Sequence, residues 1–332
     1  MNVLLITLLV SACIVVSLAG LAIAFGGPAE PRPMDSISAP FKAVDYSGLP
    51  DLQRYRARDG SALAYRTYVP GEHGHKGSVV LVHGSSASSQ SMHVMASGFA
   101  AAGYVAYALD VRGHGESGTR GRIDYVGQLE DDLEDFVRVV APPQPVTLAG
   151  FSSGGGFVLR VAGSPVRALF SGYLLLSPFI SQDARSQRPN SGGWVSVGLP
   201  RYIALGVLNA AGVRAFNALP VTRFALDEAS KAQLTASYSF PLAQNFRPQQ
   251  DYRANIRNTA DVPLSVLAGE NDEAFHADRF AEVFRSAGRD VPVVLIPGLG
   301  HIALTLDPVA VKAAVNAVES MTASAPVARE AG

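Results

Sequence analysis

The sequence predicts an α/β protein with a mostly parallel central sheet, helices on both faces and an insertion between two strands. Two observations lead to this fold class. Short apolar runs of strand length alternate with amphipathic segments of helix length through most of the chain, a rhythm typical of parallel sheets covered by crossover helices. One block that contains many aromatic residues, 179–261, breaks the rhythm with a helical or irregular pattern. We therefore expect this block to be inserted between two strands.

The chain begins with an uncharged apolar run from Val3 to Phe25. An α-helix rises about 1.5 Å per residue, so a helix over this run would be roughly 35 Å long and could cross a hydrocarbon core of about 30 Å. A cleaved signal peptide usually has a charged start and a shorter apolar region. The run therefore favours a single-pass transmembrane helix over residues 3–25, which makes the membrane an expected partner.

Two alternatives stay open for this N-terminus. Ala22-Ile23-Ala24 resembles a signal-peptidase site, and cleavage there would give a secreted or periplasmic protein. The residues that end at Cys13 resemble a lipoprotein box, although the chain stays apolar after it. The nearest positive charges, Arg32 and Lys42, follow the run, and two charges do not fix the side of the membrane on which the domain lies.

The next elements follow from local patterns. Residues 26–50 are rich in Pro, Gly and Ser and predict a linker. Leu52 to Val69 alternates around Asp59-Gly60, which predicts a hairpin with a tight turn. Further strands are expected at 79–82, 105–109, 146–149, 173–176, 263–268 and 291–296, with helices at 126–140, 275–287 and 308–321. The chain is thus divided into an anchor or signal sequence (1–25), a linker (26–50), a core (51–178 and 262–322), an insertion (179–261) and a disordered tail (323–332).

Composition excludes several classes of function. The 27 Lys and Arg residues balance the 28 Asp and Glu residues, and the chain contains no basic tract, so nucleic acid is not an expected partner. Cys13 is the only cysteine, so neither a disulfide framework nor a thiolate metal site is expected. His73-Gly74-His75 has only Glu72 as a further metal ligand nearby, and we expect no metal and no cofactor. The sequence gives no indication of the oligomeric state.

The strongest local signal is Gly150-Phe151-Ser152-Ser153-Gly154, between a predicted strand and a predicted helix. A serine nucleophile at such a strained turn needs small flanking residues, because neighbouring backbone approaches it closely. The spacing selects Ser152, since Ser153 would need glycine at position 151. We therefore expect Ser152 to be a nucleophile, with Gly150 and Gly154 making room for it.

A serine hydroxyl needs a base, and the base needs an acid that fixes its tautomer. His301 follows the last predicted strand, whereas its main rival, His276, falls at the start of a helix. Asp272 follows the strand at 263–268, with Glu270 and Asp183 as fallback acids. Because the carboxyl ends of parallel strands share one edge of the sheet, we expect Ser152, Asp272 and His301 to form a catalytic triad.

Acyl transfer also needs backbone N–H groups that stabilise the developing oxyanion. One should be the N–H of Ser153, directly after the nucleophile. The other should come from the turn after the first parallel strand, His83-Gly84-Ser85, where Gly84 permits close approach of substrate and Ser85 supplies the donor. His83 is expected to be a structural hydrogen-bonding residue rather than a catalyst.

These motifs, together with Asp110-Val111-Arg112-Gly113-His114-Gly115-Glu116-Ser117-Gly118, resemble the α/β-hydrolase superfamily, and within it the monoacylglycerol lipase and lysophospholipase group. The resemblance runs from about Leu52 to Met321. It implies an α/β-hydrolase fold whose cap is the block 179–261. It also implies that Asp110, Arg112, Gly113 and His114 form a structural turn near the site and support catalysis without taking part in it.

The leading hypothesis is therefore a serine carboxylester hydrolase that acts on a small-molecule or lipid ester, with a lipid-like ester favoured by the aromatic cap and the apolar N-terminus. Thioesterases, acyltransferases, peptidases and carbon–carbon hydrolases use the same triad on this fold, so they stay open as alternatives. A non-catalytic, membrane-tethered binding domain is the third hypothesis. It is disfavoured because such domains usually lack a triad member, and none is missing here.

Overall fold

The computed structural model describes residues 3–71 and 74–324. Its central sheet has eight strands in the order β1-β2-β4-β3-β5-β6-β10-β11. The first two form an antiparallel hairpin at one edge, β2 pairs antiparallel with β4, and all other pairs are parallel. The predicted fold class is confirmed. The strands are β1 (Gln53–Arg56), β2 (Ala62–Tyr68), β3 (Ser78–Val82), β4 (Val105–Leu109), β5 (Val146–Phe151), β6 (Gly172–Leu176), β10 (Leu264–Gly269) and β11 (Val293–Ile296).

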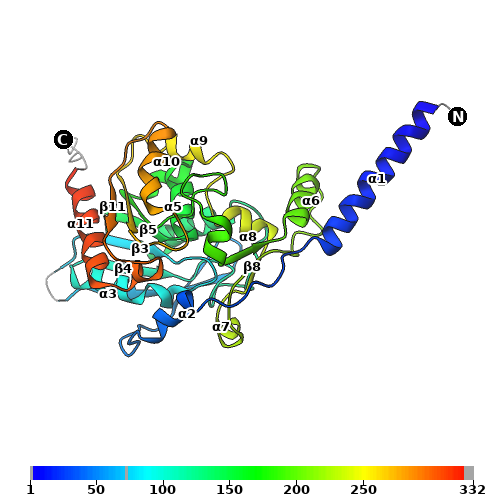
Figure 1. The fold of residues 1–332 in the computed structure, drawn as a ribbon. Coiled ribbons are helices and arrows are strands. Elements are labelled where there is room, and N and C mark those ends of the chain that lie inside the picture. Colours follow the sequence, from blue (N-terminus) through cyan, green and yellow to red (C-terminus); the bar gives the residue numbers. More distant parts are fainter. Residues whose placement is uncertain (1–2, 72–73, 325–332) are drawn as a thin grey trace.

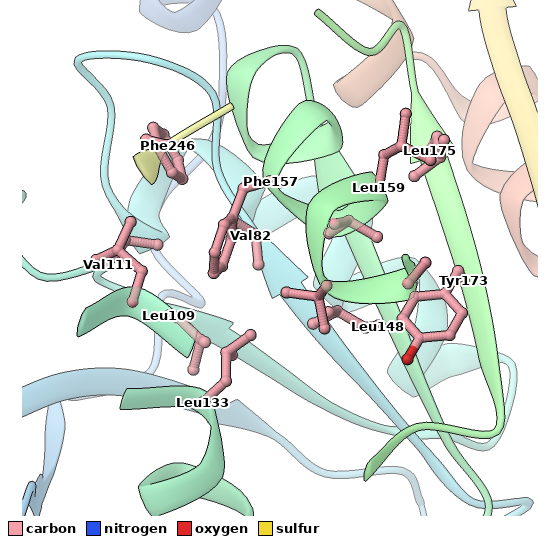
Figure 2. Close-up of a cluster of buried hydrophobic side chains, with 14 of the residues drawn as sticks. Val82, Leu109, Val111, Leu133, Leu148, Phe157, Leu159, Tyr173, Leu175 and Phe246 are labelled. Atoms are coloured by element: carbon pink, nitrogen blue, oxygen red, sulfur yellow. The ribbon is translucent and has the colours of Figure 1, made fainter. Parts of the chain in front are cut away.

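Helices cover both faces of this sheet (Figure 1). One face packs against α3 (His93–Ala101) and α11 (Pro308–Ser324), and the other against α4 (Gln128–Val140), α5 (Ser153–Ala162), α9 (Tyr252–Arg257) and α10 (Phe280–Ser286). Successive strand residues point to opposite faces, so Val80 and Val82 belong to one hydrophobic cluster and Val79 and Leu81 to the other. Figure 2 shows Phe157 of α5 beside Val82 in the first cluster.

The cap contains a small antiparallel sheet that the sequence pattern did not predict. This sheet consists of β7 (Val195–Val197), β8 (Pro220–Phe224) and β9 (Ser237–Ser239), and the cap helices are α6 (Leu199–Ala210), α7 (Glu228–Gln233) and α8 (Phe240–Asn245). Strands this short are below the length at which alternation is recognisable. Aromatic side chains of the cap pack against one another, since the rings of Trp194 and Phe224 stack with centroids 5.5 Å apart and Tyr238 meets Phe224 edge-on at 4.6 Å.

The apolar N-terminal run forms one continuous helix, α1 (Val3–Phe25), none of whose residues is buried. Within the described residues it is the one helix long and apolar enough to cross a membrane. Figure 1 shows it projecting away from the sheet, with its C-terminal end beside α6. There the Arg201 guanidinium donates to the carbonyl oxygens of Ile23 (2.8 Å), Ala24 (3.1 Å) and, in the cap, Pro220 (2.9 Å). The end of α1 is therefore attached to the cap.

The segment expected to be a linker, residues 26–50, contains the short helix α2 (Asp35–Lys42). Its Glu30 carboxylate pairs with Lys231 and, at 3.5 Å, with Arg223 of the cap. The backbone N–H of Met34 donates to the carbonyl of Ala225 at 3.1 Å. The segment therefore lies against the cap and is structured. At the other end of the chain α11 extends to residue 324, and the rest of the expected tail, 325–332, lies outside the described residues.

Candidate active site

Ser152 occupies the turn between β5 and α5, with backbone angles φ 56° and ψ −119°. A positive φ is strained for a residue with a side chain and is a mark of functional turns. The flanking glycines permit the turn, because a Cβ on Gly150 would lie 2.4 Å from the carbonyl oxygen of Gly154, and one on Gly154 would lie 2.2 Å from that of His83. The two glycines thus make room for the turn at Ser152, as the sequence pattern indicates.

The structure brings Ser152, His301 and Asp272 into one hydrogen-bonded line. The Oγ of Ser152 lies 3.0 Å from Nε2 of His301, and Nδ1 of His301 lies 2.8 Å from Oδ2 of Asp272. The three residues follow β5, β11 and β10, whose carboxyl ends share one edge of the sheet. All three side chains are buried. This geometry suits proton transfer from the hydroxyl to the imidazole.

Asp272 is fixed by the backbone that follows it. Its Oδ1 accepts hydrogen bonds from the N–H groups of Ala274 (2.8 Å) and Phe275 (2.9 Å), leaving Oδ2 for the histidine. Burial raises the pKa of this carboxyl, but the charge and hydrogen bond of His301 and the backbone N–H of Phe275 outweigh it and hold the pKa below its ordinary value. The ionised carboxylate accepts a hydrogen bond from the Nδ1–H group, so Nε2 presents its lone pair to Ser152.

The rival residues lie elsewhere, and one neighbour was missed. Glu270 and Asp183 are exposed, and His276 lies just before α10 without a hydrogen bond to the triad. Glu273 carries no sequence signal beyond its place after Asp272. Its Oε2 accepts a hydrogen bond from the backbone N–H of His301 at 2.8 Å, which fixes the loop that carries the imidazole.

The loop after β3 lies beside the nucleophile, since a Cβ on Gly84 would be 3.4 Å from the Cβ of Ser152. His83 fixes this loop. Its Nε2 accepts a hydrogen bond from the N–H of Val111 at 3.2 Å, so the ring proton is on Nδ1. The Nδ1–H group donates to the carbonyl oxygen of Gly84 at 2.7 Å. In a trans peptide the N–H points opposite to the C=O, so this contact also orients the N–H of Ser85.

Ser85 and Ser153 line the same cavity as Ser152. Neither backbone N–H donates to an acceptor in the described part of the chain. Two free N–H groups beside a serine nucleophile could stabilise a negatively charged oxygen at the reacting carbon. The structure therefore brings the two expected oxyanion-hole residues together.

The cap holds the Ser85–Ser86 turn at three points that sequence patterns did not indicate. The indole N–H of Trp194 donates to Oγ of Ser85 at 2.8 Å, and the backbone N–H of Thr235 donates to the Ser86 carbonyl at 2.9 Å. The Ser86 N–H in turn donates to the hydroxyl oxygen of Tyr238 at 2.8 Å. Ser86 itself has a φ of 70°. These three hydrogen bonds with Trp194, Thr235 and Tyr238 fix the turn and are called the cap clamp below.

His114 connects the same clamp to the core. The hydroxyl of Tyr238 lies 2.6 Å from Nε2 of His114. Because the Tyr238 oxygen already accepts from Ser86, its proton is available to His114. Burial lowers the pKa of His114 well below its ordinary value, so the ring stays neutral and Nε2 can accept that proton. His114 is therefore placed as a support beneath the turn.

The neighbouring residues of the 110–118 stretch are bonded within the core. The Arg112 guanidinium binds Asp132 through Nε (2.8 Å) and Nη2 (2.7 Å) and Asp59 through Nη1 (2.8 Å). The Asp110 carboxylate accepts hydrogen bonds from the backbone N–H groups of Ser89 (2.7 Å) and Glu116 (2.9 Å). Gly113 has a φ of 84°, which glycine adopts without steric cost. These contacts stabilise the loops around the site.

A cavity of about 580 Å³ opens at Ser152 and His301. Much of its wall is aromatic, with contributions from both the core and the cap: Phe151, Phe179, Trp194, Phe224, Phe246 and Phe275. Among the described residues that line it, none is Asp or Glu. No cluster of three or more metal-binding side chains occurs within residues 3–71 and 74–324, and the His73 and Glu72 considered from the sequence lie outside this part.

The chain is similar in sequence to known hydrolases. The profile of the family described as serine aminopeptidase, S33 (Hydrolase_4) matches residues 73–308. A monoacylglycerol lipase of Mycolicibacterium smegmatis is 34% identical over 261 residues, which cover 73% of this chain and 86% of the relative.

Two solved lipases share the fold. Monoglyceride lipase of Saccharomyces cerevisiae is 21% identical with a TM-score of 0.60, covering 82% of this chain and 94% of that one. Monoacylglycerol lipase of Paleococcus ferrophilus is 18% identical with a TM-score of 0.57, covering 79% and 98%. At these identities the structures establish the shared α/β-hydrolase fold.

Proposed function

Because the chain belongs to the serine aminopeptidase S33 family of α/β-hydrolases and is a monoacylglycerol lipase-like hydrolase of carboxylic esters, we propose that it cleaves a lipid-like ester through an acyl-enzyme on Ser152. The substrate is of the monoacylglycerol or lysophospholipid type. One observation carries this proposal: the hydrogen-bonded line of Ser152, His301 and Asp272 lies at a largely apolar cavity.

In the first half-reaction the Oγ of Ser152 attacks the ester carbonyl carbon while Nε2 of His301 takes the hydroxyl proton. The carbonyl oxygen becomes an oxyanion held by the N–H groups of Ser85 and Ser153. The carbon–oxygen bond to the alcohol then breaks, and His301 returns its proton to the departing alkoxide. Ser152 is left esterified with the acyl chain.

In the second half-reaction water attacks the acyl-enzyme as His301 takes one of its protons. The tetrahedral intermediate collapses, the bond to Oγ breaks, and His301 gives the proton back to Ser152. The products are a fatty acid and the free serine. Asp272 stabilises the imidazolium in both halves.

The cavity wall favours an ester over a peptide. An aminopeptidase must bind the cationic α-amino group of its substrate, normally with a carboxylate. No described residue that lines the cavity is acidic, whereas aromatic side chains suit an acyl chain. We therefore assign the alcohol and acyl portions of a lipid ester to this cavity.

Labelling with a fluorophosphonate probe tests the nucleophile. The full chain, purified in detergent, is expected to label, and Ser152→Ala is expected to abolish labelling. Ser153→Ala keeps its backbone N–H, so its labelling is expected to persist. Hydrolysis of monoacylglycerols and of amino-acid p-nitroanilides is then compared. Absence of labelling in the folded protein contradicts the catalytic assignment, and preferential cleavage of the anilides contradicts the ester.

We also propose that α1 is retained as a single-pass membrane anchor. Its 23 residues carry no charge, and Arg201 binds the carbonyls of Ile23 and Ala24, where the cleavage-like sequence lies. Intact-mass measurement of protein extracted from membranes is expected to give the full-length chain. A mass that starts after Ala24, together with release into the soluble fraction, contradicts retention.

A further inference from the structure

The segment before the matched family region contributes one wall of the cavity. The family profile begins at residue 73, whereas Met34, Ile37, Phe41 and Tyr46 all line the cavity that contains Ser152. This wall therefore comes from the part of the chain that joins α1 to the catalytic domain.

Two apolar residues of this wall lie on one face of α2. Ile37 and Phe41 are four residues apart, which places them on the same side of the helix, and Met34 lies directly before its first residue. Ser36 and Ala39, between them, are exposed. The helix thus turns its large apolar side chains to the cavity and these small residues to solvent.

Tertiary contacts hold α2 in place. Ile37 packs against both hydrophobic clusters of the domain and Phe41 against the second. The helix also packs on the 3₁₀ turn Ile302–Thr305, directly after His301. At eight residues, α2 is too short to be stable in isolation. Its structure therefore depends on these contacts, and its position is fixed relative to the catalytic histidine.

We propose that Ile37 and Phe41 are specificity-determining residues that set the length of acyl chain the cavity accepts. This proposal rests on the proposed function, since it assigns the acyl chain to this cavity. A side chain that lines an acyl cavity controls how many methylene groups can be buried, and each buried methylene contributes about 0.8 kcal/mol, or roughly a fourfold change in rate or affinity. Changes in wall volume should therefore act on long chains and spare short ones.

The test uses the full chain in detergent and a series of alkyl fluorophosphonates with ethyl, octyl and hexadecyl chains. Inactivation rates report entry of each chain to Ser152 without any need for ester turnover. Ile37→Trp is expected to slow inactivation by the hexadecyl probe at least about tenfold while leaving the ethyl probe nearly unchanged. Phe41→Ala is expected to shift the optimum to a longer chain. Ser36→Trp places a tryptophan on the exposed face of the same helix and serves as the matched control.

Three outcomes are informative. A loss of long-probe reactivity in Ile37→Trp but not in Ser36→Trp supports the proposal. Equal long-to-short ratios in wild type and Ile37→Trp, with unchanged thermal stability, overturn it. If Ile37→Trp changes the long-to-short ratio but the wild type hydrolyses no carboxylic ester, the role of α2 in chain-length selection is supported and the proposed function is rejected. Failure of this inference and failure of the proposed function are therefore distinguishable.

Discussion

The core and the cap contribute to the site in different ways. Ser152, Asp272 and His301 all come from the core, where each follows a parallel strand and is held by local backbone geometry. The cap supplies none of the three. It supplies the hydrogen bonds of Trp194, Thr235 and Tyr238 to the Ser85–Ser86 turn. In the proposed mechanism, activation of the nucleophile therefore depends on the core alone, whereas the oxyanion hole depends on both core and cap.

The largest effect should come from the core. Asp272→Asn removes the negative charge that fixes the His301 tautomer, and comparable changes cost about 10⁴-fold in kcat. Hydrolysis of a short p-nitrophenyl ester measures kcat, and a thermal melt checks folding. A loss of less than tenfold in a folded variant would assign the role of acid to another residue, such as Glu273.

The cap clamp is tested by Tyr238→Phe. The variant leaves the Ser86 N–H without its acceptor and His114 without its donor. Because the oxyanion turn is then less well oriented, we expect kcat for a short ester to fall about tenfold with KM nearly unchanged. A short ester is the decisive substrate, because a cap that only binds acyl chains would alter KM for long esters and leave this kcat intact.

The buried histidines predict a dependence of stability on pH. Burial lowers the pKa of both His83 and His114 below the ordinary value, so below about pH 6.5 the unfolded chain binds protons that the folded chain does not. The free energy of unfolding should therefore decrease as the pH is lowered through this range, by at most about 1 kcal/mol per histidine between pH 6.5 and 5.5. Urea titrations measure it. His114→Gln should reduce the slope, and His75→Gln, at an exposed position, should leave it unchanged.

The smallest effect is expected from Trp194→Phe. This change removes the hydrogen bond to Oγ of Ser85 and keeps most of the aromatic packing. A single hydrogen bond contributes about 1 kcal/mol, so kcat for the short ester should fall severalfold. If Trp194→Phe matched Tyr238→Phe, the clamp would act through the Ser85 side chain rather than through the Ser86 backbone.

Core features were predictable because their signals are local. The parallel strands are largely apolar runs, and the glycines around Ser152 follow from steric contacts at the turn that carries it. Ser152, Asp272 and His301 lie together at the sheet edge that the strand pattern indicates. Their catalytic roles stay predictions that the variants above test.

The remaining features depend on contacts between distant segments. Tyr238 meets His114 across 124 residues of sequence, and no local pattern encodes such a pair. The strands of the cap sheet are too short for alternation to be visible. The helix α2 has weak intrinsic stability and forms where its apolar side finds the cavity. The contacts of Glu273 with His301 and of Trp194 with Ser85 also join distant segments, so no local pattern indicates them.

The attachment of α1 to the cap through Arg201 has a consequence for how the enzyme meets its substrate. The guanidinium joins the last turn of α1 to Pro220, and farther along the chain Glu30 and Met34 also bind the cap. With α1 in a bilayer, the catalytic domain would keep a constant height and tilt instead of swinging on a tether. Collisions would then occur by lateral diffusion in two dimensions. Turnover would follow the surface density of the ester in the membrane rather than its bulk concentration.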